Sequence, residues 1–419
     1  MNNIWVRAAI PALLIHCSIG TVYCWSTFKE TIADKIGVSA FATGWAFSLA
    51  IFFLGMSAAF AGRIVEVDIH KSSLISCICF TTGMLGTGLT IQFAKGAVAL
   101  VGIYLFYGCI MGIGLGIGYL TPVKTLMLWF ADQKGLATGI SIMGFGLAKA
   151  IATPIMELLQ TKFGISAMFY VLGAVYFCMM FVGHLILKKP EGWKEETNAA
   201  KSDFKLGDLL KNKVFIGIWL MFFINIHCGL MLITYEKQIL KTLNVAEATM
   251  VFMFSLIPSI TAACNALGRI GYSTISDKMK DRSLVYQIIF SSCFVITTIV
   301  IIMSGSKGAL YPAFIIGLLM IVNLGYGGGF STLPALLSSR FGMKNISKIH
   351  GISLSAWAVA GITGNNTSEF ILSHSNTNYT YIFITATVLY VVAFFICTFL
   401  VKEKQGVKVE AAEAVEAAE

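Results

Sequence analysis

Charged residues are scarce in this sequence. Only 12% of the 419 residues are Asp, Glu, Lys or Arg, whereas 57% are hydrophobic, and the mean hydropathy is +0.80. A soluble domain contains roughly 25% charged residues, so this chain has about half the charge needed to cover a surface that faces water. The shortage excludes an ordinary soluble enzyme and a disordered chain.

Functional clusters of cysteine, histidine and acidic residues are also missing from the sequence. The ten cysteines all lie inside apolar runs, with no spacing typical of a metal site or a disulfide scaffold. We find no nucleophile–base pair, and the net charge of +9 forms no continuous basic face. We therefore expect no enzyme, no cofactor and no nucleic-acid partner. The first apolar run continues into a full span, so we also expect no cleavable signal peptide.

The apolar residues form runs of about 20, the length that crosses a hydrocarbon core of roughly 30 Å. They predict an all-α polytopic membrane protein with twelve transmembrane helices. The expected spans are 4–28, 40–62, 72–93, 98–130, 135–160, 164–187, 213–236, 247–273, 284–304, 309–337, 348–373 and 378–401. The longest hydrophilic break divides them into a six-helix half over 1–187, a linker over 188–212, a second six-helix half over 213–401 and a tail over 402–419.

The Lys and Arg residues are distributed unequally between alternate loops. Twenty of the 30 lie at the two ends of the chain or in the loops after even-numbered spans, and seven lie in the other loops. Basic residues gather on the cytoplasmic side of membrane proteins, so both termini and the central linker are expected in the cytoplasm of a bacterial inner-membrane protein.

The two halves repeat one another at a nearly constant offset of 211 or 212 residues. Parallel repeats of six spans are typical of major facilitator transporters, whose substrate site lies between the halves near the membrane midplane. Four matches occur in order: Ile15–Cys17 with Ile226–Cys228, Glu66 with Asp277, Pro122 with Pro334, and Gly139–Ser141 with Gly351–Ser353.

Four basic or potentially basic side chains are expected deep in the membrane: Lys149, Arg269, His16 and His227. No Asp or Glu lies near the middle of an expected span. Because an unpaired cation is costly in a medium of low dielectric constant, the substrate itself is expected to supply the negative charge. A carboxylate matches the planar fork of an arginine.

Each of these four basic residues could also have a purely structural role. Arg269 could pair with Asp277 or with carbonyl groups at a helix end, and Lys149 could face a water-filled vestibule. The two histidines could be hydrogen-bonded packing residues. Aromatic residues in the deeper parts of four spans could wall a small pocket, among them Tyr23, Tyr119, Tyr326 and Trp357.

Several motifs resemble the oxalate:formate antiporter family of the major facilitator superfamily, which is related to bacterial monocarboxylate transporters. The resemblance extends over nearly the whole chain. It is carried by GTVYCWSTF (20–28), GIGLGIGYLTP (112–122), WFADQKGLATGISIMGFGLA (129–148), NALGRIGYSTISDK (265–278), GYGGGFSTLPALL (325–337) and HGISLSAWAVAG (350–361).

The resemblance implies that Arg269 binds the substrate carboxylate and that Tyr23, Tyr119 and Tyr326 line the site. Asn265, at the start of the motif that contains Arg269, is included among the candidate binding residues. Oxalate transporters of the family carry a lysine where this chain has Trp357, the residue common in the monocarboxylate-type members. Lys149 stands where a small residue is expected, which suggests that a second cation has moved to the fifth span.

We expect a monomeric secondary transporter of small organic carboxylates that exchanges anions by alternating access between its two halves. In this hypothesis Arg269 holds one carboxylate and Lys149 holds a second carboxylate or a compensating charge. The first alternative is a proton-coupled symporter of monocarboxylates such as lactate, pyruvate or formate, with His16 or His227 carrying the proton. The second is a membrane sensor that binds without transporting.

Overall fold

The computed structural model describes residues 3–191, 206–243, 245–306 and 308–401, and the regular secondary structure in these ranges is helical. Most of the predicted linker and the whole predicted tail, 402–419, lie outside the described residues. Several spans combine consecutive helical segments, because short π or 3-10 stretches interrupt the α-helical hydrogen bonding without ending the helix.

The first half of the chain contains six spans. The first span consists of η1 (Trp5–Ala9), α1 (Ile10–Ile19), η2 (Gly20–Cys24) and α2 (Trp25–Ile36). The second and third spans are α3 (Ala40–Val67) and α4 (Ile69–Phe93), and the fourth consists of α5 (Gly96–Ile103), η3 (Tyr104–Met111) and α6 (Gly112–Trp129). The fifth and sixth spans are α7 (Lys134–Phe163) and α8 (Ile165–Ile186).

The second half repeats this order. Its segments are α9 (Leu206–Lys211), α10 (Lys213–Ile233), α11 (Glu236–Lys241), α12 (Glu247–Lys278), α13 (Ser283–Ser304), α14 (Tyr311–Phe341), α15 (Ile346–Ser353), α16 (Ser355–His374), α17 (Thr380–Ile396) and η5 (Cys397–Val401).

Ten helical stretches in the described ranges are long and apolar enough to cross a membrane. The other two expected spans, 247–273 and 348–373, correspond to α12 and to α15 with α16. α12 contains the charged Arg269, and the eleventh span is divided at Leu354. The observed helices are therefore consistent with the predicted twelve spans.

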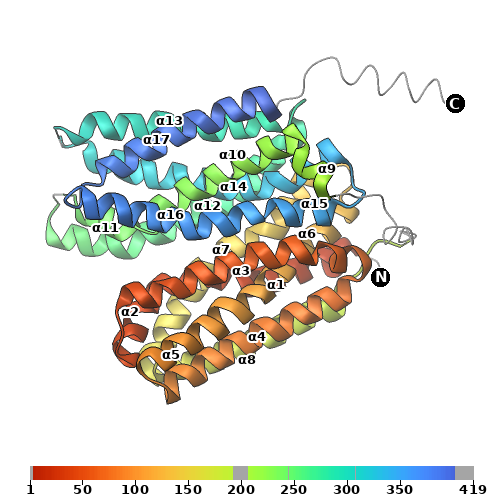
Figure 1. Ribbon diagram of the computed structural model, residues 1–419, viewed down its shortest axis with the longest axis horizontal. Helices are drawn as coiled ribbons and strands as arrows, with labels where there is room; N and C mark the ends of the chain where they lie inside the picture. Colours follow the sequence, from red (N-terminus) through yellow and green to blue (C-terminus); the bar gives the residue numbers. More distant parts are fainter. Residues whose placement is uncertain (1–2, 192–205, 244, 307, 402–419) are drawn as a thin grey trace.

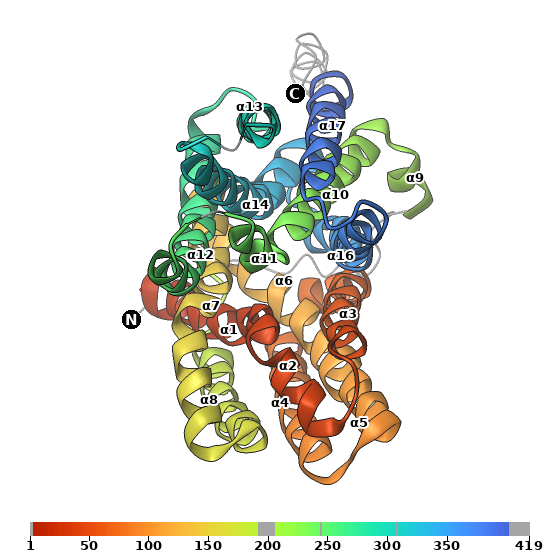
Figure 2. The same ribbon diagram turned by 90° about the vertical axis from the view of Figure 1, so that its left-hand side faces the viewer.

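The helices form two bundles that lie against each other. In Figure 1 the helices α1 to α8 occupy the lower part of the molecule and α10 to α17 the upper part, and Figure 2 shows the same two groups from one end. α7 packs along α12, and α3 packs along α15 and α16. These two contacts place the middle of α12, α7 and α16 between the bundles.

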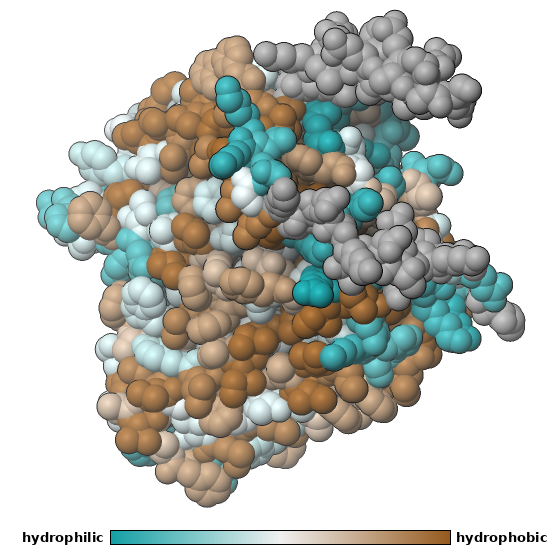
Figure 3. All heavy atoms as spheres, turned by 45° about the vertical axis from the view of Figure 1, so that its right-hand side comes forward, coloured by the Kyte–Doolittle hydropathy of each residue, from teal (hydrophilic) through white to brown (hydrophobic). Residues whose placement is uncertain are grey.

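The two ends of the bundles differ in their chain segments. The described chain begins and ends at one end, beside α9, which we call the termini end. The turn between α2 and α3 and the helix α11 lie at the other end, which we call the opposite end (Figure 1). Figure 3 shows hydrophobic side chains over much of one face, with hydrophilic side chains gathered near the termini end.

Two carboxylates join the bundles at the termini end. Asp277, near the end of α12, accepts hydrogen bonds from the backbone N–H groups of Gly135 at 2.9 Å and Leu136 at 2.8 Å, in the first turn of α7. Glu66, near the end of α3, accepts one from the N–H of Ser347 at 2.7 Å, in the first turn of α15. The N-terminus of a helix favours negative charge, so each carboxylate stabilises the start of a helix in the other half.

These two contacts follow the internal repeat of the sequence. Glu66 and Asp277 are 211 residues apart, and their partners Gly135 and Ser347 are 212 residues apart. The acid that follows the second span therefore performs the same structural task as the acid that follows the eighth span, although the first is a glutamate and the second an aspartate. Glu66 also forms a buried ion pair with Lys124, which lies on α6 of the same half.

We predict that Asp277→Asn weakens the packing of the two halves at the termini end. An asparagine cannot accept both N–H groups with a full negative charge, and a loss on the order of 1–2 kcal/mol changes the ratio of closed to open molecules by roughly 5- to 30-fold. The change can be measured as a longer distance between spin labels placed at positions 134 and 348 in a background free of other cysteines.

Asp68→Asn is the matched control for this measurement. The Asp68 carboxylate accepts from the N–H groups of His70 and Lys71 and so caps α4 within its own half. An equal change in label distance in both variants would contradict a specific role of Asp277 between the halves.

Candidate substrate-binding site

Arg269 lies on the inner face of α12 and is completely buried. Its Nε donates a hydrogen bond to the Oδ1 of Asn265 at 2.8 Å, one turn earlier on the same helix. Its Nη1 and Nη2 have no hydrogen-bond partner among the described residues. The part of the guanidinium group that could bind a carboxylate in a bidentate way therefore forms no hydrogen bond with the described chain.

Two phenylalanine rings enclose this guanidinium group. Its Cζ lies 5.6 Å from the ring centre of Phe145 on α7 and 5.4 Å from that of Phe330 on α14. Cation–π contacts at this distance stabilise a cation without neutralising its charge. Asn265 is an uncharged amide, so it orients the guanidinium and leaves its positive charge uncompensated as well.

Close helix packing brings Phe145 and Arg269 together. Phe145 is flanked by Gly144 and Gly146. A Cβ atom on Gly146 would lie 2.6 Å from the Arg269 Nε and 2.9 Å from the Asn265 Oδ1. Only a glycine at this position leaves room for the arginine beside α7, which gives the GFG sequence of this span a specific function.

Aromatic residues from both halves surround the same position. The hydroxyl groups of Tyr23 and Tyr326 are hydrogen-bonded to each other at 2.9 Å and join the two halves. The ring of Phe145 lies 5.5 Å from Tyr23, 5.7 Å from Tyr119 and 5.7 Å from Trp357. The structure therefore brings together Arg269, Asn265, the three tyrosines and Trp357 of the sequence-predicted set.

Three residues of this cluster were not predicted as site residues from the sequence. They are Phe145, Phe330 and His350, whose ring lies 5.9 Å from that of Tyr119. Phenylalanine is common in membrane spans and gives no specific signal, although the flanking glycines of Phe145 mark a close helix approach. His350 was assigned to the beginning of a span, where a histidine attracts little attention.

The two histidines predicted as site residues have different surroundings. Both ring nitrogens of the buried His16 face backbone oxygens, Nδ1 that of Ser141 and Nε2 that of Tyr119 at 3.2 Å, and a neutral imidazole donates its single N–H to one of them. His16 therefore lies next to the cluster and helps to fix α1 against α6 and α7. His227 is hydrogen-bonded through Nδ1 to the Thr363 hydroxyl at 2.9 Å, on α16, and packs against Phe223.

Lys149 lies one turn beyond Phe145 on α7 and is half-buried. It acts electrostatically on Glu236 of the other half, a buried residue at the start of α11 whose Oε1 accepts a hydrogen bond from Thr261 at 2.6 Å. Glu236 lies at the end of the predicted span 213–236 and was not predicted as a site residue. Lys149 therefore lies within electrostatic range of a buried acid of the protein, whereas the Nη atoms of Arg269 have no hydrogen-bond partner among the described residues.

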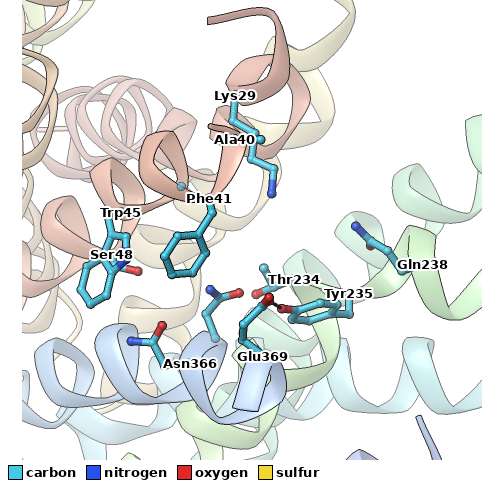
Figure 4. Close-up of a pocket in the computed structure, with 12 residues that line it drawn as sticks. Lys29, Ala40, Phe41, Trp45, Ser48, Thr234, Tyr235, Gln238, Asn366 and Glu369 are labelled. Atoms are coloured by element: carbon cyan, nitrogen blue, oxygen red, sulfur yellow. Dashed lines mark hydrogen bonds between the residues drawn. The ribbon is translucent and has the colours of Figure 1, made fainter. Parts of the chain in front are cut away.

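A polar pocket of about 230 Å³ opens between the two halves at the opposite end. Figure 4 shows Lys29 on one wall, extending towards Asn366, Tyr235 and Glu369 on the other. The Tyr235 hydroxyl donates a hydrogen bond to Glu369. Lys29 lies six residues after Tyr23 in the first span, so the pocket lies beyond the Tyr23–Tyr326 contact, on the side away from the termini.

Two membrane-spanning bundles around a buried centre rich in hydrogen-bond donors define a membrane transporter. The chain belongs to the Major Facilitator Superfamily, whose family model matches residues 12–365. Family membership confirms the predicted fold class and the expectation of a multi-pass membrane transporter of a small molecule rather than an enzyme.

Individual relatives give the same result. The oxalate:formate antiporter of Oxalobacter formigenes is 24% identical over 404 residues, which cover 96% of this chain and 92% of that protein. The apicoplast pyruvate carrier 1 of Toxoplasma gondii is 21% identical over 447 residues, covering 83% and 80%. The resemblance to the oxalate:formate antiporter family is thereby confirmed.

A solved structure supports the fold independently. A bacterial homologue of the iron transporter ferroportin, crystallised in an outward-facing state, superimposes with a TM-score of 0.75 and covers 94% of this chain and 98% of its own. At 9% sequence identity this likeness concerns the fold alone.

We predict that Asn265→Asp weakens the binding of anions. A carboxylate at this position, 2.8 Å from the Arg269 Nε in the present contact, would neutralise the guanidinium and repel an anionic substrate. The KM of an anionic substrate should rise about tenfold or more at neutral pH and fall again as the pH decreases and the new carboxylate takes up a proton.

Asn265→Ala is the control, because it removes the same hydrogen bond without adding charge. Transport by both variants can be compared over pH in reconstituted vesicles. A KM that changes equally in the two variants, with no dependence on pH, would show that the charge beside Arg269 is unimportant.

Proposed function

We propose that the protein is a secondary transporter of small organic carboxylate anions, which it exchanges across the membrane by alternating access. The observation that supports this best is the buried Arg269, whose Nη1 and Nη2 form no hydrogen bond with a described residue. A carboxylate is planar and carries two oxygens at the spacing of this fork. The named substrates of the two relatives, oxalate with formate and pyruvate, are also carboxylates.

In this mechanism the carboxylate forms two hydrogen bonds with Arg269 while Asn265 holds the guanidinium in place. The Tyr23 and Tyr326 hydroxyl groups, which bond to each other in this conformation, exchange that contact for substrate oxygens or for water when the halves separate. His16 serves the site indirectly, because its ring nitrogens face two backbone carbonyl groups. His227 faces Thr363 and contributes to the wall of the second half.

The route to Arg269 in this conformation begins at the pocket of the opposite end. The termini end is closed by the Asp277 and Glu66 contacts, whereas the pocket separates the halves around Lys29 and Glu369. From the distribution of basic residues, we propose that the termini end faces the cytoplasm of a bacterium and that the pocket faces outwards. The protein is expected to act as a monomer, because each chain contains both halves of the site.

Exchange follows from the electrostatics of the empty site. Reorientation without substrate would carry a buried, uncompensated guanidinium through the closed state, which is unfavourable at low dielectric constant. A bound carboxylate removes this penalty, so the loaded protein reorients faster than the empty one. Net transport then requires an anion on each side.

The central prediction concerns Arg269→Lys. A lysine keeps the charge and loses the planar pair of donors, so carboxylate counterflow in proteoliposomes should fall by roughly 100-fold or more, on the order of 3 kcal/mol. Wild-type uptake should depend on a carboxylate inside the vesicle.

Four results would contradict parts of this proposal. Equal uptake with and without an internal anion would exclude obligate exchange, and uptake driven by a pH gradient alone would favour proton symport. Robust movement of an uncharged or cationic solute, with no carboxylate transported, would contradict the substrate class itself. Binding without any flux would favour the sensor hypothesis.

Lys149 is proposed to compensate Glu236 rather than to bind a second carboxylate. If so, Lys149→Ala leaves a buried carboxylate unpaired and lowers transport and thermal stability, and Glu236→Gln in the same chain restores much of both. If Lys149 binds substrate instead, the single variant loses dicarboxylates more than monocarboxylates and the second substitution gives no recovery. Counterflow and thermal unfolding of the two single variants and the double variant separate these cases.

A further inference from the structure

Tyr119 of the first half faces two side chains of the second half. Its ring centre lies 5.6 Å from that of Trp357 on α16 and 5.9 Å from that of His350 on α15. His350 and Trp357 are seven residues apart, which is two helical turns, so both point to the same side although the helix is divided at Leu354. The three residues form one contact cluster across the interface of the two halves.

Each member of this cluster has a polar atom without a partner. Tyr119 and Trp357 are 0% exposed and His350 is 3% exposed. The Tyr119 hydroxyl, the Trp357 Nε1 and the His350 Nε2 have no hydrogen bond to any described residue. Since buried polar atoms are nearly always hydrogen-bonded, three such atoms on neighbouring side chains indicate a site for a hydrogen-bonding group from outside the chain.

This cluster adjoins the guanidinium group. Phe330 lies 5.4 Å from the Arg269 Cζ and 4.4 Å from the Trp357 ring. Phe145 lies 5.6 Å from the same Cζ and 5.7 Å from Trp357. Arg269 and the cluster therefore share the same two phenylalanine neighbours, and a small molecule bound to one is placed next to the other.

The chemistry of the cluster differs from that of Arg269. The Trp357 N–H can only donate, and the Tyr119 hydroxyl can donate or accept without carrying charge. The group that fits is an uncharged oxygen acceptor, such as a carbonyl or a hydroxyl oxygen. A second carboxylate would meet no fixed cation in these two residues.

We propose that His350, together with Trp357 and Tyr119, forms a second subsite that selects monocarboxylates bearing an oxo or hydroxyl group. This inference rests on the proposed function, because it requires that the carboxylate of the same molecule is bound by Arg269. The cluster holds the oxygen of the substituent. An unsubstituted acid of the same size leaves the three polar atoms unpaired and is transported less well, as expected for a site built around hydrogen bonds.

The test compares pyruvate with propionate, which have the same carbon skeleton and differ in the oxo group. In proteoliposome counterflow, the wild type should prefer pyruvate by about tenfold or more in kcat/KM. Trp357→Phe, Tyr119→Phe and His350→Phe should each lower this ratio by roughly five- to tenfold, because pyruvate transport falls more than propionate transport. Thermal unfolding of each variant, compared with the wild type, shows whether it is folded.

Trp25→Phe is the matched control. The Trp25 Nε1 donates a hydrogen bond to the backbone oxygen of Thr43, away from the cluster, so this variant should keep the wild-type ratio. A wild type that does not distinguish the two acids, or variants that lower both equally, would overturn the subsite and leave carboxylate transport intact. Failure of the wild type to move any carboxylate would instead contradict the proposed function.

Discussion

The structure depends on one buried charge whose neighbours do not neutralise it. Arg269 is held by an amide on its own helix and by two aromatic rings, and its two terminal nitrogens form no hydrogen bond with a described residue. An isolated cation in a medium of low dielectric constant is costly, and the surrounding packing must therefore over-determine its position. The glycine beside Phe145, the capped helix starts and the aromatic contacts all serve to keep this group in place.

Much of the fold could be predicted from the sequence, because bilayer thickness fixes the length of an apolar helix and each backbone group must be paired inside the membrane. The offset also relates contacts that were not predicted, because Glu66 and Asp277 accept hydrogen bonds from Ser347 and Gly135, which are themselves 212 residues apart. The division of the eleventh span at Leu354 was not predicted. No proline or charge marks it, and it depends on how α15 packs against α3.

The site was predicted less completely than the fold. Arg269 was singled out because charged residues are rare in deep spans, and the tyrosines were singled out as aromatic residues that the family resemblance places at the site. Glu236 was overlooked because a residue at the end of a span is assumed to face water, whereas a turn of α11 buries it under Thr261. His350 and Phe330 gave no signal, since burial and missing hydrogen-bond partners are properties of three-dimensional packing.

The internal repeat has one asymmetric position with a mechanical consequence. At the repeat offset that relates Glu66 to Asp277, the counterpart of Arg269 is Ala58, and Ala58 packs against Gly351 much as the backbone of Arg269 packs against Gly139. The two halves therefore pack alike at this position, yet only the second half carries a charged side chain there, Arg269. In the proposed cycle the substrate therefore stays bound to the second half, while the first half moves across it without an equivalent charge at position 58.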